Sequence, residues 1–315
     1  MVSNDPNFKR AITAEGKFFD EVAKIRTQDG RVPLEADRRV AEKYIPSKHE
    51  KLPVVDPKMA SILEKGFTDK FISSVAHKKG GRVLDICCGS GWLALELGRN
   101  GLHVDAYDVS KEAITLAKKT LRNNPYKEGF GKVNYHCTDV SKIDLGVEKY
   151  DAITGWAAFH HLPDPFDFME RAKIALKSNG IIATYDDLEM GRLAKFIELT
   201  LRFILPQIHH SYSEKLFYAA QILAKKRIIP EEIFSPMEEA KHTSVVEITE
   251  YFNENFDVIW SVRKNAFAGV PLMTVGGPDW FRYNVGRVIV GLDTVLCRLG
   301  IVRGFDQIIV ARKID

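Results

Sequence analysis

Short apolar runs alternate with longer amphipathic segments in the middle of the chain. The runs have the length of buried strands: Val83–Ile86, Val104–Tyr107, Val133–His136, Ala152–Thr154 and Ile181–Tyr185. Between them, helical periodicity predicts Trp92–Arg99, Lys111–Arg122 and Phe166–Lys177. Ser110 is a suitable N-cap for the second helix, and Asn179-Gly180 is expected to end the third. This alternation predicts a doubly wound α/β sheet with helices on both faces.

The segments on either side of this region follow a different pattern. Residues 1–80 are polar, with apolar positions at helical spacing, and are interpreted as a helical N-terminal cap before a core at 81–187. Residues 188–254 are predicted to be a helical cap insertion, with an apolar stripe that includes Leu193, Phe196 and Ile204. Residues 255–315 are predicted to add two strands, Phe256–Val262 and Phe305–Ala311, around an inserted segment at 263–304. That segment contains a helix from about Trp280 to Arg298.

Composition narrows the class of protein. The chain has 315 residues, of which 45% are hydrophobic and 28% are charged, as in an ordinary globular protein. The net charge of +3 is weak for a dedicated nucleic-acid binder. The four cysteines contain no CxxC pair, which suits reduced thiols. Neither a signal-peptide core nor a run of 18 apolar residues is present, so a cytoplasmic protein is expected.

The turn after the first predicted strand is the most informative segment. In VLDICCGSGW, a buried strand passes through Asp85 and turns at Gly89 and Gly91 into a helix. Glycines let a backbone turn sharply and approach a ligand closely. The carboxyl ends of parallel strands are where such sheets bind ligands. The pattern fits a dinucleotide such as NAD(P), but a carboxylate at Asp85 would repel a pyrophosphate and favours a cationic cofactor.

Two more carboxylates follow the next predicted strands. Asp108 ends the second strand, where a carboxylate can accept hydrogen bonds from ribose hydroxyls in either cofactor class. Asp139 follows the third strand, where it can accept from an adenine amino group. A lone Asp at such a place is equally well explained as a helix N-cap. Acidic residues at three successive strand ends favour a nucleoside-containing cofactor.

With these motifs in order, residues 82–187 resemble the core of class I S-adenosylmethionine-dependent methyltransferases. VLDICCGSG, YDVS, CTDVS and GWAAFHHLPDP match the family's motifs. The resemblance implies a seven-stranded sheet whose last strand is antiparallel, with S-adenosylmethionine as cofactor and S-adenosylhomocysteine as product. It implies cofactor contacts by these residues: Asp85, Cys87, Gly89, Gly91, Asp108, Val109, Asp139, Val140 and Trp156. Cys87 stands where the family usually has a glycine.

The segment after the fourth predicted strand contains the candidate base. His160 and His161 are the catalytic candidates, because imidazole titrates near neutral pH. A role in supporting the fold is the alternative for both. Asp164 is expected to cap the next helix. Asp186 and Asp187 alone are too few oxygen ligands for a metal site, so no metal is expected.

The acceptor is constrained mainly by exclusion. The [DNS]PP[YFW] motif of many DNA and RNA amino-methyltransferases is absent, which favours a small-molecule acceptor and no nucleic acid. We expect O-methylation of a glycan, lipid or secondary metabolite, with N- or C-methylation, an NAD(P)-dependent oxidoreductase and a non-catalytic S-adenosylmethionine-binding protein as alternatives. A monomer or homodimer is expected. The mixed apolar and basic helix near Trp280–Leu299 is expected to pack on the sheet or in a dimer, with peripheral contact at a membrane surface or a lipid-linked acceptor as the alternative.

Overall fold

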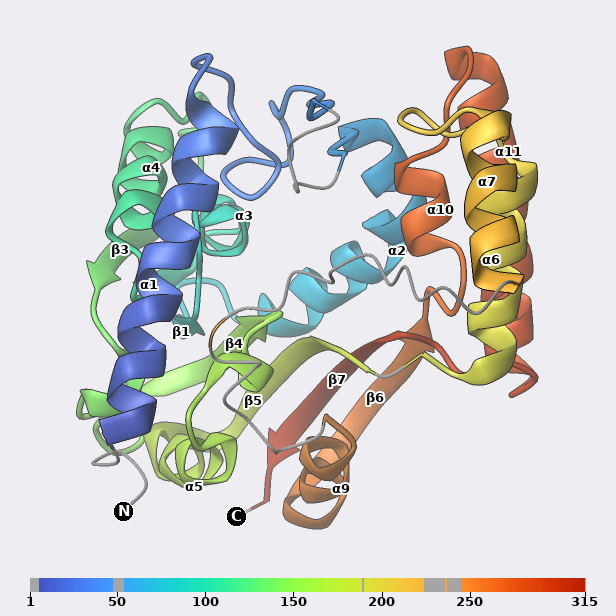
Figure 1. The fold of residues 1–315 in the computed structure, drawn as a ribbon. Helices are drawn as coiled ribbons and strands as arrows, with labels where there is room; N and C mark the ends of the chain where they lie inside the picture. The colour runs from blue at the N-terminus through green and yellow to red at the C-terminus, as the bar shows by residue number, and fades with distance from the viewer. Residues whose placement is uncertain (1–5, 48–53, 189, 224–235, 237–244, 315) are drawn as a thin grey trace.

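The computed structural model describes residues 6–47, 54–188, 190–223, 236 and 245–314. Its centre is one seven-stranded sheet in the order β3-β2-β1-β4-β5-β7-β6 (Figure 1). The strands are β1 Arg82–Ile86, β2 His103–Asp108, β3 Lys132–Cys137, β4 Tyr150–Trp156, β5 Leu176–Asp187, β6 Phe256–Lys264 and β7 Asp306–Lys313. Strands β1 to β5 are parallel, and β7 is antiparallel to both of its neighbours. The predicted fold class is confirmed.

Helices cover both faces of this sheet, as the alternating pattern predicts. One face packs against α2 Pro57–Val75, α3 Trp92–Arg99 and α4 Lys111–Arg122. The other face packs against α5 Pro165–Ala175 and α9 Val245–Asn255. The Ser110 side chain accepts from the amide of Ala113 and the Asp164 side chain from the amide of Asp167, so both predicted N-caps are confirmed.

The N-terminal helix α1, Pro6–Thr27, lies on the outside and packs against α4 (Figure 1). The Asp20 carboxylate on α1 fixes this contact. It accepts from the Ser110 hydroxyl at 2.7 Å and from the Glu112 amide at 2.9 Å. An acidic side chain at the positive end of α4 is electrostatically favourable. The helix is thereby held across the carboxyl ends of the strands.

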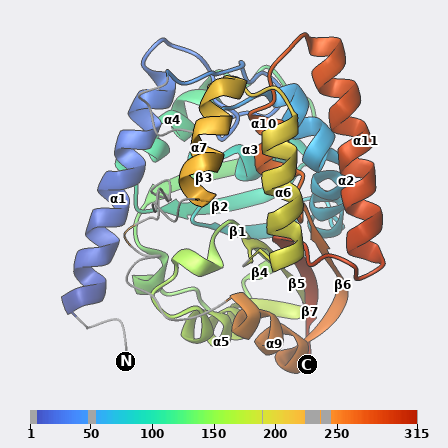
Figure 2. The same ribbon diagram turned by 45° about the vertical axis from the view of Figure 1, so that its right-hand side comes forward.

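Four more helices form the other flank of the molecule: α6 Arg192–Ile204, α7 Tyr212–Leu223, α10 Gly269–Met273 and α11 Asp279–Arg298 (Figure 2). Buried side chains from α6, α10 and α11 meet Met59 and Leu63 of α2 in a third core cluster. In the described part of the chain, no helix is both long and apolar enough to cross a bilayer.

One local expectation is wrong. Helix α5 ends at Ala175 and β5 begins at Leu176, so Asn179-Gly180 lies within the strand's span, where Asn179 has φ +59° beside an irregularity in the β4–β5 pairing. The stripe predicted on 188–254 is helical in α6, as expected, and its residues Leu193, Phe196 and Ile204 are exposed. Hydrophobic periodicity identifies a helix, but it does not reveal how much of the apolar face finds a partner.

Candidate active site

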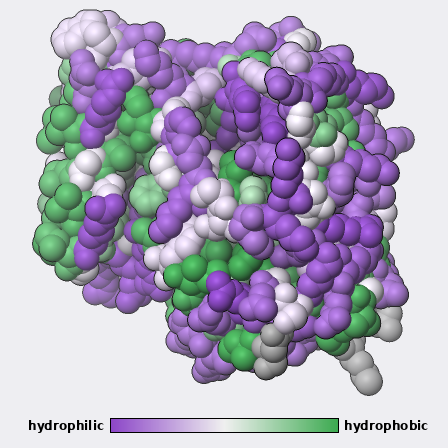
Figure 3. Space-filling view, turned by 180° about the vertical axis from the view of Figure 1, so that it is seen from behind, coloured by the Kyte–Doolittle hydropathy of each residue, from purple (hydrophilic) through white to green (hydrophobic). Residues whose placement is uncertain are grey.

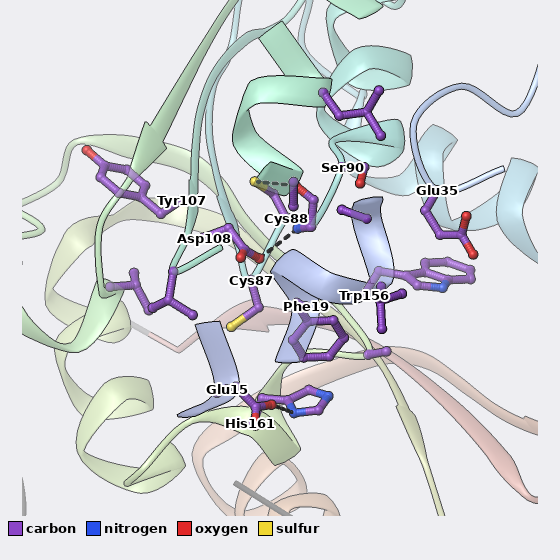
Figure 4. A pocket seen from close by; sticks show the side chains of 18 of the residues that line it. Glu15, Phe19, Glu35, Cys87, Cys88, Ser90, Tyr107, Asp108, Trp156 and His161 are labelled. Atoms are coloured by element: carbon purple, nitrogen blue, oxygen red, sulfur yellow. Dashed lines mark hydrogen bonds and ion pairs between the residues drawn. The ribbon is translucent and has the colours of Figure 1, made fainter. Parts of the chain in front are cut away.

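A cavity of about 300 Å³ lies between α1 and the carboxyl ends of β1, β2 and β4 (Figure 4). Its volume is at the lower end of the range for small-molecule sites. Predicted site residues line it as follows: Cys87, Gly89, Asp108, Val109, Asp139, Val140, Trp156 and His161. The predicted residues Asp85, Gly91 and His160 are not part of that lining.

The glycine turn presents bare backbone to the cavity. Gly89 has φ +51°, and a Cβ there would meet no atom within 4 Å, so its open side is the space a ligand would fill. Gly91 differs: it has φ +90°, and a Cβ there would lie 2.6 Å from the Tyr135 ring. Tyr135 donates to the Gly91 carbonyl at 2.9 Å. Gly91 therefore packs the turn against β3, whereas Gly89 faces the ligand.

Cys87 marks the departure from the family's glycine pattern. It adopts φ +48°, a left-handed conformation that costs a non-glycine residue roughly 1–2 kcal/mol. Burial raises the pKa of its thiol well above the ordinary value, and nearby Asp108 adds to the shift. The thiol is therefore neutral, and it lines the cavity as a small apolar group.

Asp108 ends β2 beside this turn. Its Oδ2 accepts from the Gly89 amide and its Oδ1 from the Ser110 amide, both at 2.8 Å. Burial raises the pKa of the carboxyl, and the two amide hydrogen bonds act in the opposite direction. Each carboxylate oxygen has a second lone pair, so Asp108 can still accept from two neighbouring hydroxyls, as a ribose diol requires.

Asp85 lies behind the turn in the interior. Only 1% of it is exposed, and its Oδ1 accepts from the Thr154 hydroxyl at 2.8 Å. Its Oδ2 has no hydrogen-bond partner among the described residues. Burial raises the pKa of this carboxyl to about 7, against the effect of the Thr154 hydrogen bond. A positive charge in the cavity would favour its ionised form, so Asp85 suits a cationic ligand through its field rather than by contact.

Asp139 and Val140 line the cavity after β3. The Asp139 Oδ1 accepts from the amide and hydroxyl of Ser141 at 2.9 and 2.7 Å, and Oδ2 lies 2.9 Å from Lys142 Nζ. Asp139 thus caps the short 3₁₀ helix Val140–Lys142, as the structural alternative predicts. This capping turns the carboxylate and the start of the helix toward one end of the cavity.

Trp156 forms a wall nearer the other end, where Figure 4 also places Glu35. Its ring stacks on Tyr185 with centroids 4.2 Å apart and meets Trp92 edge to face at 4.9 Å. The ring is therefore fixed by packing on two sides. The Arg38 guanidinium also lies 5.1 Å from the ring centroid, so the ring already has a cation over it and serves the cavity as an apolar wall.

Two charged residues at this end of the cavity, an arginine and a glutamate, were not predicted as site residues from the sequence. Arg26 of α1 pairs with Glu35 of the following loop, and both line the cavity. Burial lowers the pKa of the Arg26 guanidinium to about 10, so it stays charged, and its Nε has no hydrogen-bond partner among the described residues. A buried cation with a spare donor in a ligand cavity suits a carboxylate. No local motif identifies it, because α1 is distant in sequence from the turn.

The two histidines follow β4, and each meets a carboxylate. His161 Nδ1 lies 2.7 Å from Glu15 Oε1 of α1, and the ring packs against Phe19 (Figure 4). His160 Nδ1 lies 2.8 Å from Asp186 Oδ1 at the end of β5. The two rings are 4.1 Å apart. Only His161 lines the cavity, while His160 faces the β5 side.

Comparisons with known proteins agree with this geometry. A family model described as a methyltransferase domain matches residues 59–219, about half of the chain. A ubiquinone biosynthesis O-methyltransferase of Coxiella burnetii is 30% identical over 111 residues, which are 35% of this chain and 45% of that protein. The corresponding enzyme of Actinobacillus pleuropneumoniae is 28% identical over 103 residues, 33% of this chain and 44% of that one. This chain thus matches less than half the length of these curated relatives.

Solved structures share the fold over most of the chain. A putative sarcosine dimethylglycine methyltransferase from Galdieria sulphuraria has a TM-score of 0.51 at 13% identity, covering 94% of this chain and 98% of that one. The [4+2]-cyclase SpnF has a TM-score of 0.50 at 13% identity, covering 95% and 94%. At such identity these neighbours establish the fold alone. The matched family model identifies the chain as a member of the class I S-adenosylmethionine-dependent methyltransferases, and the fold of these neighbours agrees with it.

Proposed function

We propose that the chain transfers the methyl group of S-adenosylmethionine to a hydroxyl of a small molecule, with His161 as the proton acceptor. The observation that carries this proposal is a histidine in the cofactor cavity whose Nδ1 faces a buried carboxylate, Glu15, at 2.7 Å. A carboxylate this close to Nδ1 favours a proton on that nitrogen and leaves the second ring nitrogen, Nε2, to take up the proton of the acceptor. A hydroxyl needs this help more than an uncharged amine, which is already nucleophilic.

The cavity's own residues would hold the cofactor along its length. Asp108 would bind the ribose hydroxyls, and the backbone at Gly89 would lie against the ligand. Asp139 and Val140 would border the adenine. Arg26 would bind the α-carboxylate, beside the Trp156 wall. Bound S-adenosylmethionine supplies a methyl group on a positively charged sulfur, and the buried carboxylate of Asp85 favours that charge over the neutral product.

The residues around the reacting atoms would orient the acceptor and exclude water. Ile12 and Phe19 of α1 and Leu162 after β4 give the cavity apolar walls. Alignment of reactants is worth up to roughly 7–11 kcal/mol, and a general base adds about 10²–10⁴-fold. His160, held by Asp186, would act as a positioning residue against the His161 ring.

The relatives support an oxygen acceptor without defining it. Both curated proteins described above are named O-methyltransferases. Each match covers only about a third of this chain, so it does not define the acceptor pocket. We therefore propose the acceptor class, a hydroxyl-bearing small molecule with an apolar body, and no individual compound.

A transfer assay with a radiolabelled methyl group tests this proposal. Acceptors would include a catechol, a primary amine and a thiol of similar size. We expect label on the catechol, and we expect His161→Gln to lower kcat by about 10²-fold or more. His103→Gln, at an exposed position on β2, is the matched control. Label on the amine alone, or full activity of His161→Gln, would contradict the proposed chemistry.

A further inference from the structure

The outer faces of α6, α7 and α11 carry an unusual number of exposed large apolar side chains. They are Leu193, Phe196, Leu199, Phe203 and Ile204 on α6, Tyr212, Leu216 and Phe217 on α7, and Trp280, Val288, Leu292, Val295 and Leu299 on α11. Phe196, Trp280 and Val288 are 69%, 70% and 71% exposed. We call this set the outer apolar face. Exposed apolar surface on this scale marks an interaction site.

The opposite faces of two of these helices are packed. Ala194 of α6 and Tyr283 and Ile289 of α11 lie in the third core cluster. The helices therefore have fixed positions, and their outward side chains have no room to turn inward. α6, α7 and α11 lie on one flank of the molecule (Figures 1 and 2). From behind, apolar side chains gather on the flank where α11 lies (Figure 3).

The charges on the three helices are unequal. Arg192 and Lys195 on α6 and Arg287 and Arg298 on α11 are exposed, and none of them forms an ion pair with another residue that the structure describes. The face therefore carries solvent-accessible positive charge among its apolar groups.

The acidic residues of the same helices are already engaged. Glu198 pairs with Arg202, and Asp279 pairs with Arg282. Glu214 accepts from Ser211, and the buried Asp293 accepts from three backbone amides, including that of Phe267. Within the described residues, the four exposed cations therefore outnumber the one exposed acid of these helices, Asp279, whose side chain is 69% exposed.

We propose that the outer apolar face docks on the surface of an anionic lipid bilayer. Amphipathic helices with apolar and basic side chains on one exposed side bind at the headgroup boundary by apolar burial and by attraction to anionic lipid. Trp280, exposed at the start of α11, is of the type enriched at that boundary. This inference does not depend on the acceptor or the base proposed above.

A second copy of the chain is the less favourable occupant. A two-fold interface places the same patch against itself. The cations of one copy would then meet those of the other in excess of the exposed acid of these helices, and buried like charges oppose association. An anionic bilayer complements both the charge and the apolar groups.

Vesicle co-sedimentation of the full chain tests the proposal. The probes are vesicles of phosphatidylcholine alone and of an equal mixture of phosphatidylcholine and phosphatidylglycerol. We expect binding to the mixed vesicles that weakens with added salt. Phe196→Asp with Leu292→Asp should lower the partition coefficient at least tenfold, and Arg287→Glu with Arg298→Glu should remove the preference for the anionic vesicles. Val147→Asp, at a 75% exposed apolar position on the β3–β4 loop, should change neither result.

Folding and oligomeric state are checked on the same samples. All substituted side chains are exposed, so the thermal midpoint and S-adenosylhomocysteine affinity should match the parent protein. The proposal is overturned if the parent protein binds neither vesicle, or if the double variants bind as the parent does. It is also overturned if ultracentrifugation detects a dimer that Phe196→Asp with Leu292→Asp dissociates while vesicle binding stays absent.

Discussion

Replacing Asp85 by Asn should remove one contribution to the pH dependence of the protein's stability. The carboxyl is 1% exposed, and burial raises its pKa to about 7, against 3.8 for an ordinary aspartate. Because the folded-state pKa is the higher one, the unfolded chain loses this proton first as the pH rises. The neutral carboxyl's contribution to stability is therefore complete below about pH 4 and is lost as the pH rises through 7.

The size of the effect follows from these two values. A difference of about three pKa units between the folded and unfolded states lowers the free energy of unfolding by roughly 4 kcal/mol above pH 8, relative to pH below 4. Roughly 3 kcal/mol of this loss develops between pH 5 and pH 8. Asn has nearly the same shape and does not titrate. It leaves a buried amide poorly paired beside Thr154, which costs about 1–3 kcal/mol at both pH values. The change between the two pH values is therefore the diagnostic quantity.

Urea unfolding of both proteins at pH 5 and pH 8, without cofactor, measures it. The free energy of unfolding of Asp85→Asn, taken relative to that of the parent protein, should rise by roughly 3 kcal/mol between pH 5 and pH 8. Asp151→Asn is the matched control of opposite sign. Burial alone would raise the pKa of Asp151, but hydrogen bonds from Lys177, Lys78 and the Arg82 amide outweigh it and hold that pKa well below the usual range. Asp151→Asn should therefore lower the free energy of unfolding more at pH 5 and above than in strong acid. If Asp85→Asn and the parent change in parallel, Asp85 is ionised in the folded protein and the burial argument is wrong.

Three further substitutions test other parts of the account. Gly91→Ala should destabilise the fold by at least about 1–3 kcal/mol in thermal unfolding, because its Cβ would lie 2.6 Å from the Tyr135 ring at φ +90°; an unchanged midpoint would refute this. Lys264→Met should lower the free energy of unfolding by about 3–5 kcal/mol, because it removes the ammonium that lies 2.7 Å from the buried Asp306 carboxylate. Lys264→Met with Asp306→Leu should recover much of that loss in the same assay, and a double variant no better than the single one would argue against the charge explanation. Arg26→Ala should weaken S-adenosylhomocysteine at least tenfold in calorimetry and leave methylthioadenosine, which lacks the carboxylate, unaffected; equal losses for both would place the arginine's role elsewhere.

Much of the sheet and of the cavity floor follows from local sequence. The positions of the strands along the chain are encoded by short apolar runs, and Asp108 and Gly89 lie in contiguous motifs where the turn itself brings them to the cavity. Local sequence does not predict which residues of α1 cover the cavity. Glu15 and Arg26 meet the cavity because α1 packs on α4, where Asp20 accepts hydrogen bonds from Ser110 and Glu112. Gly91 and Asp85 lie in the motif of the glycine turn but do not line the cavity, and they support the turn from the protein interior. Motif spacing does not show this, because it does not indicate how deeply a position is buried.

The outer apolar face illustrates the same limit from another side. Leu193 and Phe196 form a regular stripe, and regular stripes are usually buried. Their exposure depends on how many neighbours the third core cluster supplies to α6, and that number is set by tertiary packing. Amphipathicity alone therefore predicted the helix and left its partner undetermined.

Calorimetric titration of the protein with S-adenosylmethionine, S-adenosylhomocysteine and NADH tests the central claim, that the cavity between α1 and the strand ends binds the methyl donor. Asp108→Ala is the site variant, and Asp257→Ala, with a carboxylate 62% exposed on β6, is the control. We predict binding of both adenosyl ligands by the parent and the control, at least tenfold weaker binding by Asp108→Ala, and no binding of NADH. Binding of NADH in place of the adenosyl ligands, or unchanged affinity in Asp108→Ala, would contradict the account.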